Sequence, residues 1–258
     1  MDLGLKGKRA IVCASSKGLG RSCALTLARE GVGVVVNGRN KEALDRTAAE
    51  VEAVGNLIAA VGADVTTQAG RERLLAACPD PDILITNTAG PPLGDFRDWD
   101  AEIWQEALND LMISPIMLMR SVLDKMIERR FGRIINITSV SVKMPAPDRG
   151  LTNGAKTGLT GFMAGLAQQT AVHNVTINNV LPGFFATDRG RQSLQQRAER
   201  AGVDPTEFRD QFLQKVPARR LGEPDEFGAL CAYICSRQNS FMTGQNISLD
   251  GGLFNSTI

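Results

Sequence analysis

Histidine and tyrosine are almost absent from this sequence of 258 residues, which holds one of each, His173 and Tyr233. A single imidazole excludes a metal cage built from several histidines, and any Ser-His-Asp triad would have to use His173. The five cysteines show no CxxC spacing, which argues against a zinc ribbon and against a disulfide framework. We therefore expect no metal site.

An excess of either charge and a long apolar run are also missing. The chain has 29 Lys+Arg and 28 Asp+Glu, for a formal net charge of +1, so it has no general attraction to nucleic acid or to an anionic membrane. No apolar run reaches the roughly 18 to 20 residues that span a bilayer, and the first residues lack a signal-peptide core. We expect a cytoplasmic protein that binds neither nucleic acid nor membrane.

Short β-branched runs alternate with longer amphipathic stretches along the whole chain. The predicted strands cover 9–14, 32–37, 56–64, 82–87, 132–139, 175–182 and 245–249, and the predicted helices lie near 19–30, 41–54, 67–77, 99–130, 152–171 and 224–236. Such alternation is typical of parallel strands joined by helical crossovers. The fold class predicted is α/β, a doubly wound Rossmann-type parallel sheet of about seven strands with helices on both faces. Since no linker or repeat divides the chain, residues 1–258 should form a single domain.

One long segment, residues 188–220, interrupts this alternation after the sixth strand. It carries eight basic and five acidic residues, a local charge of +3. A segment that leaves the carboxyl end of a strand borders the ligand crevice of an open α/β sheet, so this segment is a candidate substrate lid. A solvated helical excursion without function is the alternative.

A glycine-containing loop follows the first strand. Its sequence, CASSKGLG at 13–20, runs directly into a predicted helix. Glycines there let the backbone approach a pyrophosphate, whose charge the helix N-terminus stabilises. Because the loop joins the first strand to the first helix, it stands where a dinucleotide site must lie.

The end of the second strand indicates which dinucleotide would bind. An Asp or Glu there would accept from the ribose 2′-OH of NAD, but the chain has Arg39. Arg39 and Lys17 would both neutralise a 2′-phosphate through charge-assisted hydrogen bonds. The sequence favours NADP(H), with NAD(H) as the alternative; ordinary surface cations are the other interpretation of this pair.

These motifs resemble those of the short-chain dehydrogenase/reductase family, particularly its 3-oxoacyl-carrier-protein reductase-like members, along nearly the whole chain. CASSKGLG resembles the family's TGxxxGxG loop, Ala-Asp-Val at 63–65 its adenine-contacting segment, and Asn-Thr-Ala-Gly at 87–90 its NNAG. INITSVS resembles the strand that ends in the catalytic Ser, NNVLPGFFAT the PGxxxT nicotinamide segment, and VPARRLGEPDEFG with TGQNISLDGG the C-terminal signature. The resemblance implies cofactor binding by Ala14, Ser16, Lys17, Gly18, Leu19, Gly20, Arg39, Asp64, Val65, Asn87, Ala89, Gly90, Lys156, Pro182, Gly183 and Thr187.

The resemblance also implies the reaction, which is hydride transfer between a nicotinamide and a carbonyl or alcohol carbon. In the family a Ser binds the substrate oxygen, a Tyr thirteen residues later exchanges the proton, and a Lys four residues further holds the ribose. Here Ser139 and Lys156 keep this register, but Thr152 stands at the tyrosine position. An aliphatic hydroxyl is a far weaker acid than a phenol, and Tyr233 lies in an apolar helical stretch where we expect a packed aromatic.

Two further positions depart from the family pattern. The Asn of the family's proton relay aligns with Leu111, and Asn109, two residues earlier, should lie about 200° away around an α-helix. Ala14 replaces the first glycine of the loop, which is acceptable if its φ angle is negative.

The residues leave two functions open. The first is an NADP(H)-dependent oxidoreductase with a remodelled proton relay, in which Ser139 holds the oxygen and Lys156 supplies the proton through water or Thr152. The second is an NADP(H)-binding protein with little or no turnover, acting as a sensor or partner subunit.

The substrate should be a carbonyl or alcohol compound. Met144, Phe184 and Phe185 are candidate pocket residues, and the basic lid suggests an anionic or carrier-linked compound, although packing alone explains both features equally well. The resemblance implies a homotetramer or homodimer.

Overall fold

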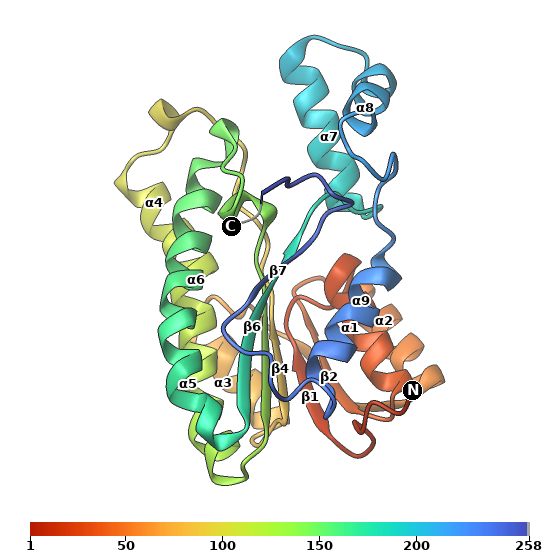
Figure 1. The fold of residues 1–258 in the computed structure, drawn as a ribbon, viewed down its shortest axis with the longest axis vertical. Helices are drawn as coiled ribbons and strands as arrows, with labels where there is room; N and C mark the ends of the chain where they lie inside the picture. Colours follow the sequence, from red (N-terminus) through yellow and green to blue (C-terminus); the bar gives the residue numbers. More distant parts are fainter. Residues whose placement is uncertain (257–258) are drawn as a thin grey trace.

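Seven strands form one parallel sheet in the computed structural model, which describes residues 1–256 (Figure 1). The predicted sheet is therefore confirmed. The strands are β1 (Arg9–Val12), β2 (Gly33–Gly38), β3 (Asn56–Gly62), β4 (Ile83–Thr86), β5 (Gly132–Ile137), β6 (Val175–Pro182) and β7 (Asn246–Leu249). Their order is β3-β2-β1-β4-β5-β6-β7, so the chain winds outward from β1 and then restarts at β4. Parallel sheets of this kind bind ligands at that switch point, outside the carboxyl ends of the strands.

Helices cover both faces of the sheet. They are α1 (Gly18–Arg29), α2 (Lys41–Val54), α3 (Gln68–Ala77), α4 (Ala101–Leu108), α5 (Ser114–Glu128), α6 (Gly150–Thr170), α7 (Asp188–Ala201), α8 (Pro205–Leu213) and α9 (Pro224–Cys235). In Figure 1, α1, α2 and α9 lie on one side of the sheet and α3, α5 and α6 on the other. Because both faces are covered, β2, β4 and β5 are buried along their whole length. In residues 1–256 no helix is both long and apolar enough to cross a membrane.

A row of polar side chains connects four neighbouring strands of the sheet. Thr86 of β4 donates to the amide oxygen of Asn136 in β5 at 2.6 Å. The Asn136 amide nitrogen donates to Asn179 in β6 at 3.1 Å, and that of Asn179 donates to Asn246 in β7 at 2.8 Å. Buried amides need such partners, and a shift of one strand by one residue would break the row. The row therefore helps to fix the register of four strands.

Capping side chains set the starts of several helices near the site. Asn40 accepts from the Ala43 N–H at 2.8 Å, Thr67 from Gly70 at 3.0 Å and Thr187 from Gly190 at 3.0 Å. Each cap satisfies an otherwise unpaired N–H of the first helical turn. As a result α2, α3 and α7 begin close to the carboxyl ends of β2, β3 and β6.

The long helix predicted over 99–130 is interrupted. It consists of α4, a π-helical turn at Asn109–Ile113, and α5. Such turns are rare and often lie at functional sites. The segment 188–220 forms the helices α7 and α8, which rise above the carboxyl edge of the sheet in Figure 1.

Candidate active site

A cavity of about 720 Å³ lies at the carboxyl edge of the sheet, and the loops that follow β1 to β6 all contribute to its wall. Most residues that the sequence marked as candidates meet there. Those that line it are Ala14, Ser16, Lys17, Gly18, Leu19, Arg39, Asp64, Val65, Asn87, Ala89, Gly90, Ser139, Pro182, Gly183 and Thr187. Gly20, Thr152 and Lys156 are not part of this lining.

The loop between β1 and α1 forms one end of the cavity. Ala14 has a φ of 45°, so the condition under which an alanine is unstrained here is not met. An alanine in this left-handed region is strained by roughly 1–2 kcal/mol. Gly20 has no room for a side chain, because a Cβ there would lie 2.5 Å from the Ala14 carbonyl oxygen. The chain thus packs tightly against the start of α1, whose first N–H groups have no side-chain cap and fit a pyrophosphate.

Two cationic side chains lie at this end of the cavity, one in the loop and one after β2. Lys17 directly precedes α1 and makes no side-chain hydrogen bond or ion pair with any described residue. Arg39, after β2, has a 65% exposed side chain and contacts the Asp64 carboxylate at 3.2 Å. Burial would raise the pKa of Asp64, but hydrogen bonds from Thr66 and the Arg39 guanidinium hold it below its usual value. Both cations border the cavity and have donors free for a phosphate.

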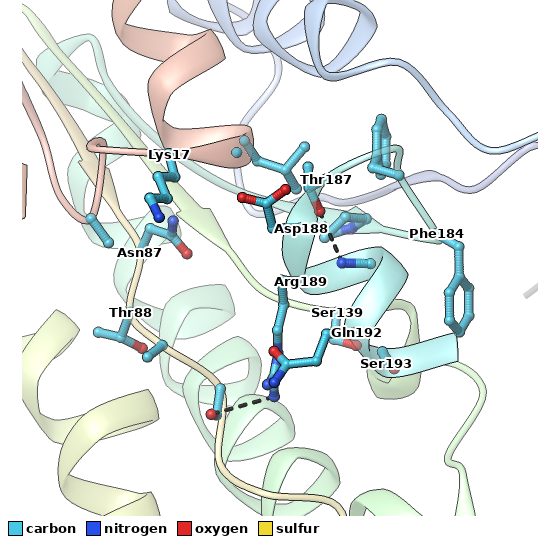
Figure 2. Close-up of a pocket in the computed structure, with 18 of the residues that line it drawn as sticks. Lys17, Asn87, Thr88, Ser139, Phe184, Thr187, Asp188, Arg189, Gln192 and Ser193 are labelled. Carbon is cyan, nitrogen blue, oxygen red and sulfur yellow. Dashed lines mark hydrogen bonds between the residues drawn. The ribbon is translucent and has the colours of Figure 1, made fainter. Parts of the chain in front are cut away.

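Ser139 lies on the floor of the cavity at the end of β5, and it is 9% exposed. Its Oγ accepts from the Ser141 N–H at 3.1 Å, which leaves its own hydrogen free to donate. Ser139 shares this cavity with Gln192 and Ser193 of α7 and with Lys17 and Asn87, all of which Figure 2 labels. Ser139 can therefore bind an oxygen atom of a molecule in the cavity.

Lys156 and Thr152 lie on the first turns of α6. The Lys156 Nζ donates to the Ile137 carbonyl at 2.8 Å, and this is its one hydrogen bond within residues 1–256. Burial lowers the pKa of Lys156 to about 8, because no carboxylate offsets the loss of water around the ammonium. Thr152 is half-buried. The Lys156 ammonium is thus hydrogen-bonded to Ile137, the residue two positions before Ser139 at the end of β5.

The two rare side chains lie outside the cavity. His173 ends a short 3-10 turn just before β6, at the opposite end of that strand. Tyr233 is 41% exposed on α9, so the expectation that it packs in the interior is wrong. No tyrosine lines the cavity in the part of the chain described.

Asn109 and Leu111 both lie in the π-helical turn, and neither lines the cavity. Leu111 is 1% exposed and packs in the interior. The α-helical angle between the two positions does not apply in this turn. The Asn109 amide donates to the Thr66 carbonyl at 3.2 Å and to Asp110 at 3.2 Å. Asp110, which sequence analysis missed, lines the cavity, and burial raises the pKa of its carboxyl group.

Helix α7 is joined to the opposite rim of the cavity by arginines. Arg189 donates to the Pro91 carbonyl at 3.1 Å. It also donates to the Gly90 carbonyl at 3.5 Å, the bond that Figure 2 draws as a dashed line from Arg189. Arg197 pairs with Asp148 at 3.0 Å. These contacts connect residues far apart in the sequence, so local patterns gave no sign of them. The predicted pocket residues Phe184, Phe185 and Met144 all line the cavity.

Comparison with known proteins agrees with this arrangement. The sequence profile of the family described as "Enoyl-(Acyl carrier protein) reductase" matches residues 13–254. The chain belongs to the short-chain dehydrogenase/reductase family. In this short-chain dehydrogenase/reductase the strands form one Rossmann-type sheet. The family motifs follow one another along the chain, from the loop after β1 to the C-terminal signature.

Relatives in this family carry several activities. The NADPH-dependent reductase BacG of Bacillus subtilis (strain 168) is 29% identical over 95% of this chain and 97% of its own length. Gluconate 5-dehydrogenase of Gluconobacter oxydans (strain 621H) is 31% identical over 96% of this chain and 95% of its own. A crystal structure of YwfH, described as an NADPH-dependent reductase involved in bacilysin biosynthesis, covers 96% of this chain and 99% of its own, with a TM-score of 0.90 and 27% identity.

Proposed function

We propose that this protein is an NADP(H)-dependent oxidoreductase that transfers a hydride between the nicotinamide and a carbonyl or alcohol group of a small molecule. One observation carries the proposal: Ser139, the cations Lys17 and Arg39, and the open N-terminus of α1 all face one cavity. Membership of an oxidoreductase family and the NADPH-dependent relatives support it.

The preference for NADP(H) is assigned to Lys17 and Arg39. Charge-assisted hydrogen bonds contribute about 1.5–3 kcal/mol each, so Arg39→Ala should weaken NADPH binding about tenfold to a hundredfold. NADH affinity should stay within about twofold. Arg46→Ala is the matched control, because Arg46 lies on the neighbouring helix and pairs with Glu42 at the surface. The affinities are measured by fluorescence titration. If Arg39→Ala lost NADPH and NADH affinity equally, the NADP(H) preference could not be assigned to Arg39.

In the proposed reaction bound NADPH supplies the hydride. The Ser139 hydroxyl donates to the carbonyl oxygen of the substrate, since its Oγ already accepts from Ser141. Lys156 supplies the proton, through water or the Thr152 hydroxyl. Its pKa of about 8 suits this role, because a proton donor works best when its pKa is near the working pH.

The absence of a tyrosine from the cavity supports a second function. Loss of a general acid typically lowers a rate by about 10² to 10⁴, so the protein would then bind NADP(H) as a sensor or partner subunit with little or no turnover. A panel of ketones, 3-oxoacyl thioesters and quinones, followed by nicotinamide absorbance, separates the two. Turnover by the wild type supports the enzyme. A silent wild type together with an active Thr152→Tyr variant supports the binding protein.

The same proposal includes a lid and an assembly. Segment 188–220 would close over the substrate, and hydrogen exchange in α7 should then slow when cofactor and substrate bind. A homotetramer or homodimer would cover apolar side chains exposed on the long helices and near the C-terminus, including Ile113, Phe162 and Phe241. Light scattering of the purified protein tests the assembly, and a monomer at micromolar concentration would contradict it.

A further inference from the structure

The part of the cavity that borders α7 holds a partly buried arginine that forms no ion pair within residues 1–256. Arg149 lies at the start of α6 and lines the cavity. Its guanidinium donates to the Ser193 hydroxyl of α7 at 2.8 Å, and it forms no ion pair within residues 1–256. Burial lowers its pKa to about 10, with Arg197 and Arg189 acting in the same direction. Its remaining N–H groups are available to a ligand.

A second arginine lies beside it. Arg197 pairs with Asp148 at 3.0 Å, but its Nε is buried and has no hydrogen-bond partner. The guanidinium carbons of Arg149 and Arg197 lie 5.8 Å and 5.6 Å from the centroid of the Phe184 ring. Both arginines line the cavity, so their outer N–H groups can reach a ligand there. The two arginines and Ser193 thus form a preorganised anion site next to an aromatic wall.

The charge of the site indicates which anion it fits. Arg149 and Arg197 carry two positive charges and Asp148 carries one negative charge, so this pair of arginines keeps one uncompensated positive charge. Arg189, whose charge also acts on Arg149, is hydrogen-bonded to the Gly90 and Pro91 carbonyls at the rim. A carboxylate carries one negative charge and accepts from planar guanidinium groups in a bidentate way. A phosphate carries nearly two negative charges and more bound water. It fits this space less well, because Phe184 and Phe212, whose ring centroids are 4.4 Å apart, also border it.

We propose that Arg149, Arg197 and Ser193 bind a carboxylate group of the substrate, so that the substrate is a carbonyl compound with an apolar body and a carboxylate. The inference rests on the proposed function and names its substrate class. Figure 2 shows Ser193 and Phe184 on the far side of Ser139 from Lys17. The carboxylate would therefore hold the substrate from the side opposite the cofactor cations.

The test uses benzoylformate, benzoylpropionate and benzoylbutyrate, which differ in the distance between carbonyl and carboxylate, and the methyl ester of each. Binding to the NADP⁺-loaded protein is measured by calorimetry, so the readout does not depend on turnover. At least one acid should bind tenfold or more tightly than its ester, as expected for one charge-assisted hydrogen bond. Arg149→Met and Arg197→Met should each reduce this ratio toward one, and Arg149→Lys should restore part of it.

Arg209→Gln serves as the control, because Arg209 lies on α8, is half exposed and pairs with Asp210 at the surface. Its acid-to-ester ratio should equal that of the wild type. The inference is overturned if the wild type binds each acid and its ester with equal affinity, or if it binds phenyl phosphate more tightly than every acid. If NADP⁺ still binds in that case, the proposed function is unaffected. Absence of NADP⁺ and NADPH binding would instead overturn the proposed function itself.

Discussion

The buried ammonium of Lys156 makes the stability of this protein depend on pH in a defined way. Its pKa falls from 10.5 to about 8 on burial. This difference corresponds to about 3 kcal/mol, since one pKa unit is about 1.4 kcal/mol. Between these two values the unfolded chain binds more protons at this site than the folded chain, so stability rises with pH there. Below about pH 8 both states are protonated, and the full cost of burying the charge is present.

Replacing Lys156 by Met removes the titration but keeps an unbranched side chain of similar length. Urea unfolding of both proteins, under reducing conditions, should show the free energy of unfolding of the wild type rising relative to Lys156→Met by about 3 kcal/mol between pH 8 and 10.5. Other titrating groups are common to both proteins and cancel in the difference. The neutral amine still donates to Ile137, so this hydrogen bond does not oppose the trend.

The same ionisation should govern the reduction of a carbonyl substrate. If the Lys156 ammonium supplies the proton, kcat/KM for reduction stays level below about pH 8 and falls about tenfold per pH unit above it. If the difference in unfolding free energy between the wild type and Lys156→Met stayed constant between pH 8 and 10.5, burial would not have lowered the pKa of Lys156. A rate profile without a decline above pH 8 would refute the role of Lys156 as proton donor.

Other variants test the fold around the site. Ala14→Gly relieves the left-handed backbone at φ 45° and, after the entropy cost of glycine, should stabilise the protein by roughly 0.5–1 kcal/mol; a lower melting temperature than the wild type would contradict this. Asn136→Ala leaves both Thr86 and Asn179 without their buried partner and should cost roughly 2–4 kcal/mol in urea unfolding. Asn246→Ala, at the edge strand, breaks only the last bond of the row and should cost about 1 kcal/mol; equal losses would show that the row does not act as a connected network.

Local sequence patterns were sufficient to predict the sheet and most of the cavity. The alternation of β-branched and amphipathic runs predicts parallel strands, because each crossover needs a helix. In such a sheet the carboxyl ends of the strands meet at one edge, so the loops that contain Lys17, Asn87 and Ser139 had to come together. No long-range information was needed for this step.

Features that depend on backbone detail or distant contacts were not predictable. The positive φ of Ala14 and the π-helical turn around Asn109 depend on packing that a single sequence does not reveal. Sequence analysis did not single out Arg149, because its partner Ser193 lies forty-four residues later on α7. Asp110 was hidden within a stretch expected to be ordinary α-helix.

The central claim is that this family member reduces a carbonyl compound without a tyrosine acid. The most direct measurement is NADPH oxidation by purified wild type, Lys156→Met and Thr152→Tyr across the carbonyl panel. The account predicts steady turnover by the wild type that Lys156→Met abolishes while the folded state persists. A wild type that binds NADPH but turns over none of the panel, beside an active Thr152→Tyr variant, would contradict it.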